Sequence, residues 1–206
     1  MWLLAGGLGV GLIILTGVVA AGAGPLIRAD EATVVAADMA SARHPSLVVV
    51  VRLVTDAGSP LSIDLLTAVV AAFLLVRRRV RAAIYIAAVR GLELGVETLV
   101  KVTVDRPRPS VPTLLATAQG MSFPSGHTAG TAALCASLLL LFRPALAARG
   151  QALALAAGAV VVAVVAASRV LLGVHYPSDV VGGALLGMLC AVVLGPFVTG
   201  RPDCGR

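Results

Sequence analysis

Residues 151–198 read QALALAAGAVVVAVVAASRVLLGVHYPSDVVGGALLGMLCAVVLGPFV, and this stretch decides the fold. It holds two long apolar runs, 151–171 and 178–198, on either side of one short polar segment. Each run has about the 20 residues that a helix needs to cross a bilayer. Neither run alternates apolar and polar residues as a half-buried strand does, and a backbone in lipid is best satisfied by helices. The stretch therefore predicts two membrane-spanning helices joined by a tight polar connection.

Four more apolar segments precede this pair, at about 2–24, 60–76, 81–101 and 127–142. The chain of 206 residues is 59% hydrophobic and 13% charged, whereas about 25% of the residues in soluble domains are charged. Too few polar side chains remain to cover a water-facing surface, which excludes a soluble globular, disordered or coiled-coil protein. We therefore predict an all-α fold, with residues 1–206 forming one integral-membrane domain built as a six-transmembrane-helix bundle.

The first apolar segment is open to two interpretations. Small residues follow it, as they follow the apolar run of a secretory signal peptide, but no positively charged region precedes it. We favour a retained first span over a cleaved signal.

The polar stretch 25–59 lies between the first two apolar segments. Its residues 47–54 are apolar but too few to span, so we expect a helix that lies at the membrane interface. Arginines gather in the connection 77–81, in the connection 143–149 and in the C-terminal tail. By the positive-inside rule these regions are cytoplasmic, which puts both termini in the cytoplasm and the polar stretch outside.

The net charge of +6 comes from 16 basic and 10 acidic residues, and Lys101 is the only lysine. In a soluble chain this balance would suggest nucleic acid as a partner. In a membrane chain it fits cytoplasmic arginines together with a site for an anionic substrate, so we expect no nucleic-acid partner. The three cysteines have no C-x-x-C spacing, and we expect neither a metal site nor a disulfide framework.

Three clusters of polar residues interrupt the apolar pattern, and with six spans all three fall at the outer face. They are Lys101–Pro109, Pro124–His127, and Ser168–Arg169 together with His175–Asp179. A charge at the edge of a membrane is costly unless it is paired or used. The clusters are therefore candidates for a functional site.

Several residues of these clusters suit the binding of a phosphoryl group. Lys101, Arg108 and Arg169 are cations, and arginine offers planar, bidentate donors to phosphate. Ser125 and Gly126 open a helix, where free backbone N–H groups and the helix dipole favour an anion. Taken singly, these features are typical of headgroup anchors and helix caps. Their joint presence at one face predicts an anion-binding site.

Two histidines supply chemistry for such a site. His175 and Asp179 are four residues apart at a helix start that contains Pro177, so the carboxylate can hold the imidazole. A histidine held in this way can act as a nucleophile toward phosphorus. His127, on a different helix, is placed to protonate the leaving group as a general acid.

These clusters resemble the pattern of the type 2 phosphatidic acid phosphatase family, which is K-x6-R-P, then P-S-G-H, then S-R-x5-H-x3-D. Every motif position and spacing matches, and the resemblance covers about residues 60–198. It implies a metal-independent phosphatase without a cofactor, with a helical core and a site at the outer face.

The resemblance also implies roles, because the family mechanism runs through a phosphohistidine. His175 attacks phosphorus, Asp179 orients it, and His127 protonates the leaving group and then activates water. The residues that would hold the phosphoryl oxygens are Lys101, Arg108, Ser125, Gly126 and Arg169. The supporting motif positions are Pro109, Pro124 and Ser168.

Four charged residues of the third apolar segment share one helix face: Arg90, Glu93, Glu97 and Lys101. Charges inside a span point to the bundle interior and pair. We expect a structural ion pair between Arg90 and Glu93 or Glu97, and support of Lys101 by Glu97.

Three acidic or basic residues near the clusters receive no catalytic role. We expect Asp64 to lie at the headgroup level or to pair with a loop. Asp105 and Arg106 lie inside the first motif but are not among its fixed positions.

The leading hypothesis is a phosphatase of the bacterial plasma membrane that acts on a lipid phosphate or diphosphate, with membrane lipids around it. Among these substrates we favour a polyprenyl diphosphate such as undecaprenyl or decaprenyl diphosphate, with phosphatidylglycerol phosphate and phosphatidic acid as alternatives. A lipid phosphotransferase with the same residues and a non-enzymatic transporter or scaffold remain open. Nothing in the sequence indicates an oligomeric state.

Overall fold

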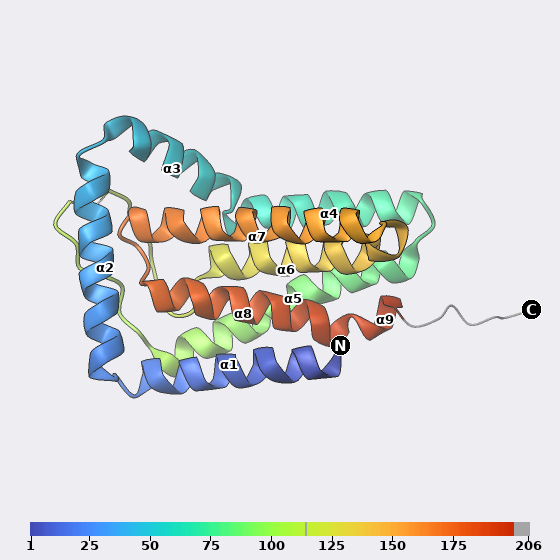
Figure 1. The fold of residues 1–206 in the computed structure, drawn as a ribbon, viewed down its shortest axis with the longest axis horizontal. Helices are drawn as coiled ribbons and strands as arrows, with labels where there is room; N and C mark the ends of the chain where they lie inside the picture. The colour runs from blue at the N-terminus through green and yellow to red at the C-terminus, as the bar shows by residue number, and fades with distance from the viewer. Residues whose placement is uncertain (114, 200–206) are drawn as a thin grey trace, which may run out of the picture.

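All regular structure in the described residues, 1–113 and 115–199 of a computed structural model, is helical, as the sequence predicts. The helices are α1 (Trp2–Ala20), α2 (Gly24–Ala42), α3 (Pro45–Ala57), α4 (Pro60–Val76), α5 (Val80–Val104), α6 (Gly126–Phe142), α7 (Ala148–Leu171), α8 (Pro177–Leu194) and α9 (Pro196–Thr199), with a short 3-10 turn at Arg143–Ala145. Figure 1 shows α1 and α4 to α8 running lengthwise, while α2 crosses one end of this bundle.

Four of the described helices are long and apolar enough to cross a membrane: α1, α6 with the turn after it, α7 and α8. The bent pair α2 and α3 would bring this number to five if it formed one span. The predicted second and third spans, α4 and α5, are not among these helices, for identifiable reasons. Helix α4 has only 17 residues, and α5 carries the charged residues Arg81, Arg90, Glu93, Glu97 and Lys101 along its 25.

The polar stretch 25–59 is more helical than its sequence suggested. Helix α3 covers residues 47–54, but it is preceded by a second helix, α2, and the two meet at an angle of 118°. Prolines in the first turns of α2, α3 and α4 mark the helix starts, because proline lacks the N–H that a first turn leaves unpaired.

The core of the bundle lies where α5, α6 and α8 meet. Tyr85, Val89, Ala133 and Leu186 are buried there in one apolar cluster. The Tyr85 hydroxyl donates a hydrogen bond of 2.9 Å to the carbonyl of Ala191, which ties α5 to α8 and satisfies a buried polar group.

Two glycines let α8 approach α6 closely. Gly183 and Gly187 form a G-x-x-x-G pattern, which is typical of close helix contacts in membranes. A Cβ on Gly183 would overlap the carbonyl oxygen of Ser125, and one on Gly187 would overlap that of Ala129. This contact sets the start of α6 against the start of α8, where two of the three polar clusters lie.

Replacement of Gly187 by alanine is expected to force α6 and α8 apart and to lower the free energy of unfolding by about 1–3 kcal/mol, the usual cost of overpacking. The measurement is thermal unfolding in detergent. Gly95→Ala on α5 is the matched control, because no atom lies within 4 Å of a Cβ at that position. Equal unfolding temperatures for the two variants would contradict the tight contact.

Candidate active site

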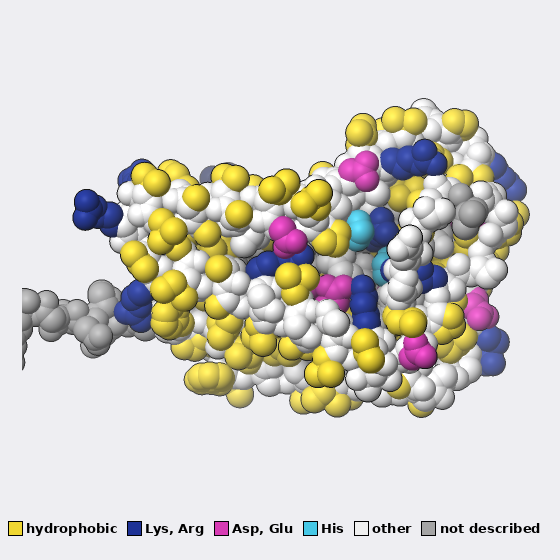
Figure 2. Space-filling view, turned by 180° about the vertical axis from the view of Figure 1, so that it is seen from behind, with side chains coloured by type: hydrophobic (Ala, Val, Ile, Leu, Met, Phe, Trp, Pro, Cys, Tyr) yellow, Lys and Arg dark blue, Asp and Glu magenta, His cyan; other side chains and the backbone are white. Residues whose placement is uncertain are grey.

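The three polar clusters come together at the end of the bundle that α2 crosses. Figure 2 shows a hollow near one end of the molecule in which histidine and Lys or Arg side chains gather. Lys101 lies in the last turn of α5, Ser125 is the N-cap of α6, and His175 precedes α8. The Ser125 N–H donates to the carbonyl of Asp179 at 3.0 Å, so the second and third clusters are joined by backbone.

His175 and Asp179 form the pair that their spacing predicts. The Nδ1 atom of His175 lies 3.3 Å from Oδ2 of Asp179, and both side chains are buried. The same Oδ2 accepts the N–H of Tyr176 at 2.9 Å and the hydroxyl of Ser122. Asp179 is therefore held in place from several sides.

Arg108 determines which nitrogen of His175 carries the proton. Its Nη1 lies 3.1 Å from Nε2 of His175. A guanidinium group can only donate, so Nε2 accepts, and in the neutral ring the proton sits on Nδ1, facing Asp179. The Nε2 lone pair is thus directed away from the carboxylate, toward the cationic part of the site.

Burial is the main influence on the charge of His175. It lowers the pKa of His175 to about 4, against an opposing effect of Asp179 and with smaller lowering effects of Arg108 and Arg169. A neutral imidazole at pH 7 is the form that a nucleophile requires.

This protonation state can be measured directly because the chain has three histidines. In ¹⁵N-histidine-labelled protein in detergent, with signals assigned by single His→Ala variants, we expect the His175 ring to be still neutral at pH 5.5. A ring with the ordinary pKa of about 6.5 would be about nine-tenths protonated there. A His175 midpoint near 6.5 would contradict the burial argument.

The Arg108 guanidinium is braced by backbone carbonyls. Its Nε donates to Gly120 and its Nη1 to Val174, both at 2.9 Å. Its Nη2 donates to Gln119 at 2.9 Å and to Met121 at 3.3 Å. The loop before α6 and the connection between α7 and α8 therefore fix the orientation of Arg108 next to His175.

Lys101 and Gly126 share one neighbour, Glu97. The Lys101 ammonium lies 2.6 Å from Oε1 of Glu97, the support that the helix spacing predicts. The carboxylate also lies against the backbone of Gly126, where a Cβ would overlap it. Glu97 thus connects the end of α5 to the first turn of α6.

Arg169 is buried, and it is held by α3. Its Nη1 donates to the hydroxyl of Thr55, while its Nε has no hydrogen-bond partner among the described residues. An unsatisfied N–H of a buried guanidinium is costly, and a phosphoryl oxygen is a suitable acceptor for it.

Ser168, expected as a supporting motif residue, is hydrogen-bonded within its own helix. The Ser168 hydroxyl donates to the carbonyl of Val165 in its own helix at 2.6 Å. The two motif prolines are placed by the loop: Pro109 is half-buried, and Pro124 is buried with a cis bond to Phe123.

His127, in the first turn of α6, is half-buried. Lys101, Arg108, Arg169 and His175 all lie close enough to act electrostatically on its imidazole. The structure therefore brings together the eight residues that the sequence assigned to catalysis and phosphate binding: His127, His175, Asp179, Lys101, Arg108, Ser125, Gly126 and Arg169.

The charges on α5 pair differently from the expectation in one respect. Arg90 contacts Glu93 as expected, but its Nε also lies 2.6 Å from Oδ1 of Asp64 on α4. Asp64 was expected at the headgroup level or in a pair with a loop. The loop pairing was wrong, because α4 packs against α5 and brings Asp64 to Arg90. The position at the headgroup level stays a prediction.

Sequence reasoning missed three residues that touch the Asp179 region: Asp30, Arg106 and Ser122. Arg106 was visible inside the first motif as a charge near the membrane, and its burial was the overlooked signal. Asp30 and Ser122 carry no local signal, because their role depends on tertiary contacts. Among the described residues, no group of three or more His, Cys, Asp or Glu side chains has an arrangement that could hold a metal ion.

The sequence profile of the PAP2 superfamily matches residues 80–202. The chain belongs to this superfamily, which confirms the resemblance seen in its motifs, and it is a lipid phosphatase.

Named relatives and solved structures agree with this family. The chain is 33% identical over 177 residues to decaprenylphosphoryl-5-phosphoribose phosphatase of Mycobacterium tuberculosis, covering 84% of this chain and 93% of the relative. The Mycolicibacterium smegmatis enzyme of the same name is 31% identical, covering 76% and 82%. The transmembrane PAP2-type phosphatidylglycerolphosphate phosphatase of Bacillus subtilis matches at a TM-score of 0.86, with 25% identity and 98% of each chain covered. Aquifex aeolicus LpxE matches at 0.57, with 27% identity, covering 74% of this chain and 87% of that one.

Proposed function

We propose that this chain removes a terminal phosphoryl group from a polyprenyl-linked lipid through a phosphohistidine on His175. The observation that carries the proposal is the orientation of His175, whose Nε2 accepts from Arg108 while Nδ1 faces Asp179. A neutral ring with its Nε2 lone pair beside several cations is suited to attack a bound phosphate.

In the first step, Nε2 of His175 forms a bond to phosphorus as the bond from phosphorus to the leaving oxygen breaks. His127 gives its proton to that oxygen, and the negative charge of the bound phosphate favours the protonated form of His127 that this requires. Lys101, Arg108, Arg169 and the N–H groups at the start of α6 stabilise the phosphoryl oxygens. Asp179 balances the positive charge on the modified imidazole.

In the second step, water attacks phosphorus and the phosphorus–nitrogen bond breaks. His127, now neutral, takes a proton from the water. Inorganic phosphate leaves, and His175 returns to the neutral state with its proton on Nδ1.

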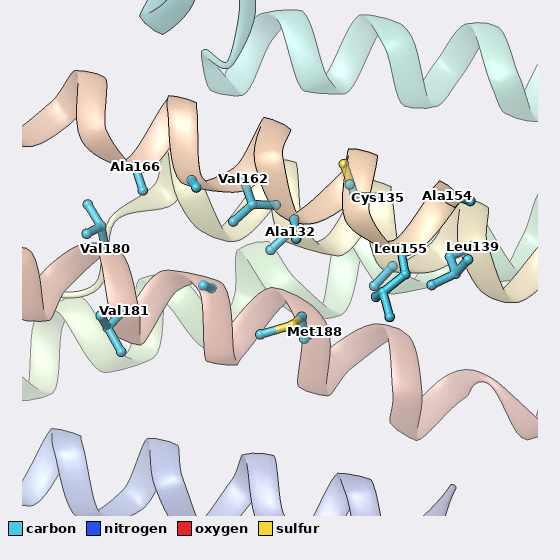
Figure 3. Close-up of a pocket in the computed structure, with 15 residues that line it drawn as sticks. Ala132, Cys135, Leu139, Ala154, Leu155, Val162, Ala166, Val180, Val181 and Met188 are labelled. Atoms are coloured by element: carbon cyan, nitrogen blue, oxygen red, sulfur yellow. The ribbon is translucent and has the colours of Figure 1, made fainter. Parts of the chain in front are cut away.

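An apolar groove between α6, α7 and α8 is suited to the lipid tail. It has a volume of about 340 Å³ and is lined by alanine, valine, leucine, glycine, cysteine and methionine side chains. Figure 3 shows Ala166 and Val180 at one end of this groove, with Leu139 and Ala154 at the other. Ala166 and Val180 are close in sequence to Arg169 and Asp179, so this end of the groove lies toward the candidate active site.

The named relatives suggest which polyprenyl lipid is the substrate. By their names, the mycobacterial enzymes act on decaprenylphosphoryl-5-phosphoribose. We propose a polyprenylphosphoryl phosphoribose first, in which the scissile phosphate is a sugar ester, and a polyprenyl diphosphate second. Phosphatidylglycerol phosphate, the substrate in the name of the Bacillus subtilis structure, is the third.

We further propose six membrane spans in a bacterial plasma membrane, with α4 and α5 among them, the site outside and both termini in the cytoplasm. The lengthwise arrangement of α4 and α5 beside the other helices supports this topology (Figure 1). The arginine-rich connection between α4 and α5 lies at the end opposite α2, as the positive-inside rule requires for a site at the outer face.

The test is phosphate release by the purified protein in detergent with EDTA, from each of these three lipids and from phosphatidic acid, with His175→Ala as the control. We expect release that survives EDTA, is lost in the variant and is fastest with a polyprenyl substrate. Transfer of phosphate to a second lipid instead of water would indicate a phosphotransferase. Release unchanged in the variant would reject the phosphohistidine mechanism.

A further inference from the structure

Arg106 lies at the centre of a buried polar network that the mechanism above does not use. Its Nη1 donates to Oδ1 of Asp179 at 2.6 Å and to the hydroxyl of Ser178 at 2.7 Å. Its Nη2 donates to Oδ2 of Asp30 at 2.8 Å. The side chain is only 7% exposed, so these contacts are made away from water.

Two further contacts fix this network in place. The Arg106 guanidinium stacks on the ring of Tyr176, with its central carbon 4.0 Å from the ring centroid. Asp30 accepts the N–H of Ser178 at 3.0 Å and also contacts the Ser178 hydroxyl. Asp30 lies on α2, so the helix that crosses the end of the bundle is attached directly to the first turn of α8 (Figure 1).

The contacts of Asp179 are divided between its two oxygens. Oδ1 is bound by Arg106, whereas Oδ2 faces His175 and accepts from Tyr176 and Ser122. Because Arg106 holds Oδ1, the carboxylate cannot rotate away from the imidazole without losing a charged hydrogen bond in a dry site.

The net charge of the network contributes to the electrostatic potential at the His175 ring. Asp179 and Arg106 alone would form a neutral pair, which would give little stabilisation to a positively charged ring. Asp30 adds a second negative charge, so the three side chains together carry a net charge of about −1 when all are ionised. That charge favours the positive imidazole that forms when His175 bonds to phosphorus.

We propose that Arg106 and Asp30 are positioning residues for the phosphoryl-transfer step. Arg106 fixes the orientation of Asp179 toward His175, and Asp30 keeps the network anionic. Helix α2 thereby belongs to the catalytic assembly. The inference rests on the proposed nucleophilic role of His175.

The first part of the test is the kinetics of Arg106→Gln and Asp30→Asn. Loss of the partners that orient metal ligands in metalloenzymes costs about 10- to 100-fold, and we expect kcat to fall by a similar amount while KM changes less than about threefold. Arg106→Lys, which keeps the charge, should recover part of the lost kcat. Glu31→Gln is the matched control, because Glu31 is the exposed neighbour of Asp30 on α2.

The second part distinguishes positioning from a merely structural role. The charged groups that act most directly on His175 are Asp179, Arg108 and Arg169, and all three remain in these variants, so a shift reports the lost charge of Arg106 or Asp30. In the labelled-histidine titration, Arg106→Gln removes a positive charge and should raise the pKa of His175. Asp30→Asn removes a negative charge and should lower it. Loosened packing alone would not produce shifts of opposite sign.

Two results would overturn the inference: a kcat for Arg106→Gln and Asp30→Asn equal to that of Glu31→Gln, or His175 shifts in the same direction in both variants. These results differ from a failure of the proposed function. If His175→Ala keeps the wild-type rate, the phosphohistidine mechanism itself is rejected. If His175→Ala is inactive while the Arg106 and Asp30 variants behave as the control, only the positioning role is lost.

Discussion

Replacement of His175 by alanine is expected to lower the rate of phosphate release by about 10⁴-fold or more, the scale of loss when a nucleophile is removed from an enzyme. The reason is that Nε2 of His175 accepts from Arg108 and is therefore the unprotonated nitrogen that can attack phosphorus, whereas His127 is assigned the proton-transfer role. The measurement is phosphate release from the preferred lipid, with thermal unfolding as a check that the variant folds.

A trapping experiment tests the same residue independently of the steady-state rate. With ³²P-labelled lipid and a rapid quench, the wild-type protein should carry a phosphate that is stable in alkali and labile in acid, as a phosphorus–nitrogen bond is. His175→Ala should carry none. His44→Ala is the control, because His44 is exposed and lies between α2 and α3. Equal labelling of the wild-type protein and His175→Ala would identify another group as the acceptor.

Replacement of Asp179 by asparagine is expected to lower kcat by about 10³- to 10⁴-fold, similar to the loss of the orienting aspartate in a Ser-His-Asp triad. The amide has nearly the same shape, but its NH₂ group would replace one oxygen that accepts hydrogen bonds, and would point at a donor. Arg106 donates to one oxygen of Asp179, and Tyr176 and Ser122 donate to the other, so either orientation of the amide loses a bond. Arg106 would also lose one of its two balancing charges.

The effect of Asp179→Asn should fall on kcat and leave KM within about threefold, because Asp179 contacts the histidine and not the phosphate-binding cations. Asp105→Asn is the matched control: Asp105 is an exposed aspartate at the C-cap of α5, next to Arg106. Retention of more than a tenth of the wild-type kcat by Asp179→Asn would mean that the carboxylate does not support His175.

Local spacing predicted much of the site. His175 directly precedes α8 and Asp179 lies in its first turn, so both meet at this helix start, and the interval between Glu97 and Lys101 is about one helical turn. Both contacts join residues that are close in sequence, so the sequence is enough to infer them. The motif resemblance added the grouping of clusters that lie on different helices.

The remainder depends on contacts between distant segments. Arg106 and Asp30 are separated by 76 residues, and no periodicity connects them. The carbonyls that brace Arg108 come from an irregular loop whose path only the fold determines. Other features were readable but overlooked: the pattern of Gly183 and Gly187 signals a close helix contact, and Pro25 and Pro45 mark the starts of two helices in place of one.

The position of the apolar groove has a consequence for how the enzyme meets its substrate. The groove runs along α6, α7 and α8, which are proposed membrane spans. Its walls are apolar side chains, against which one lipid tail can exchange for another. A lipid therefore need not leave the bilayer to be cleaved, and encounter becomes a two-dimensional search within the membrane. The rate should then follow the mole fraction of substrate among the surrounding lipids or detergent, and dilution with inert detergent should slow turnover even when the bulk concentration is held constant.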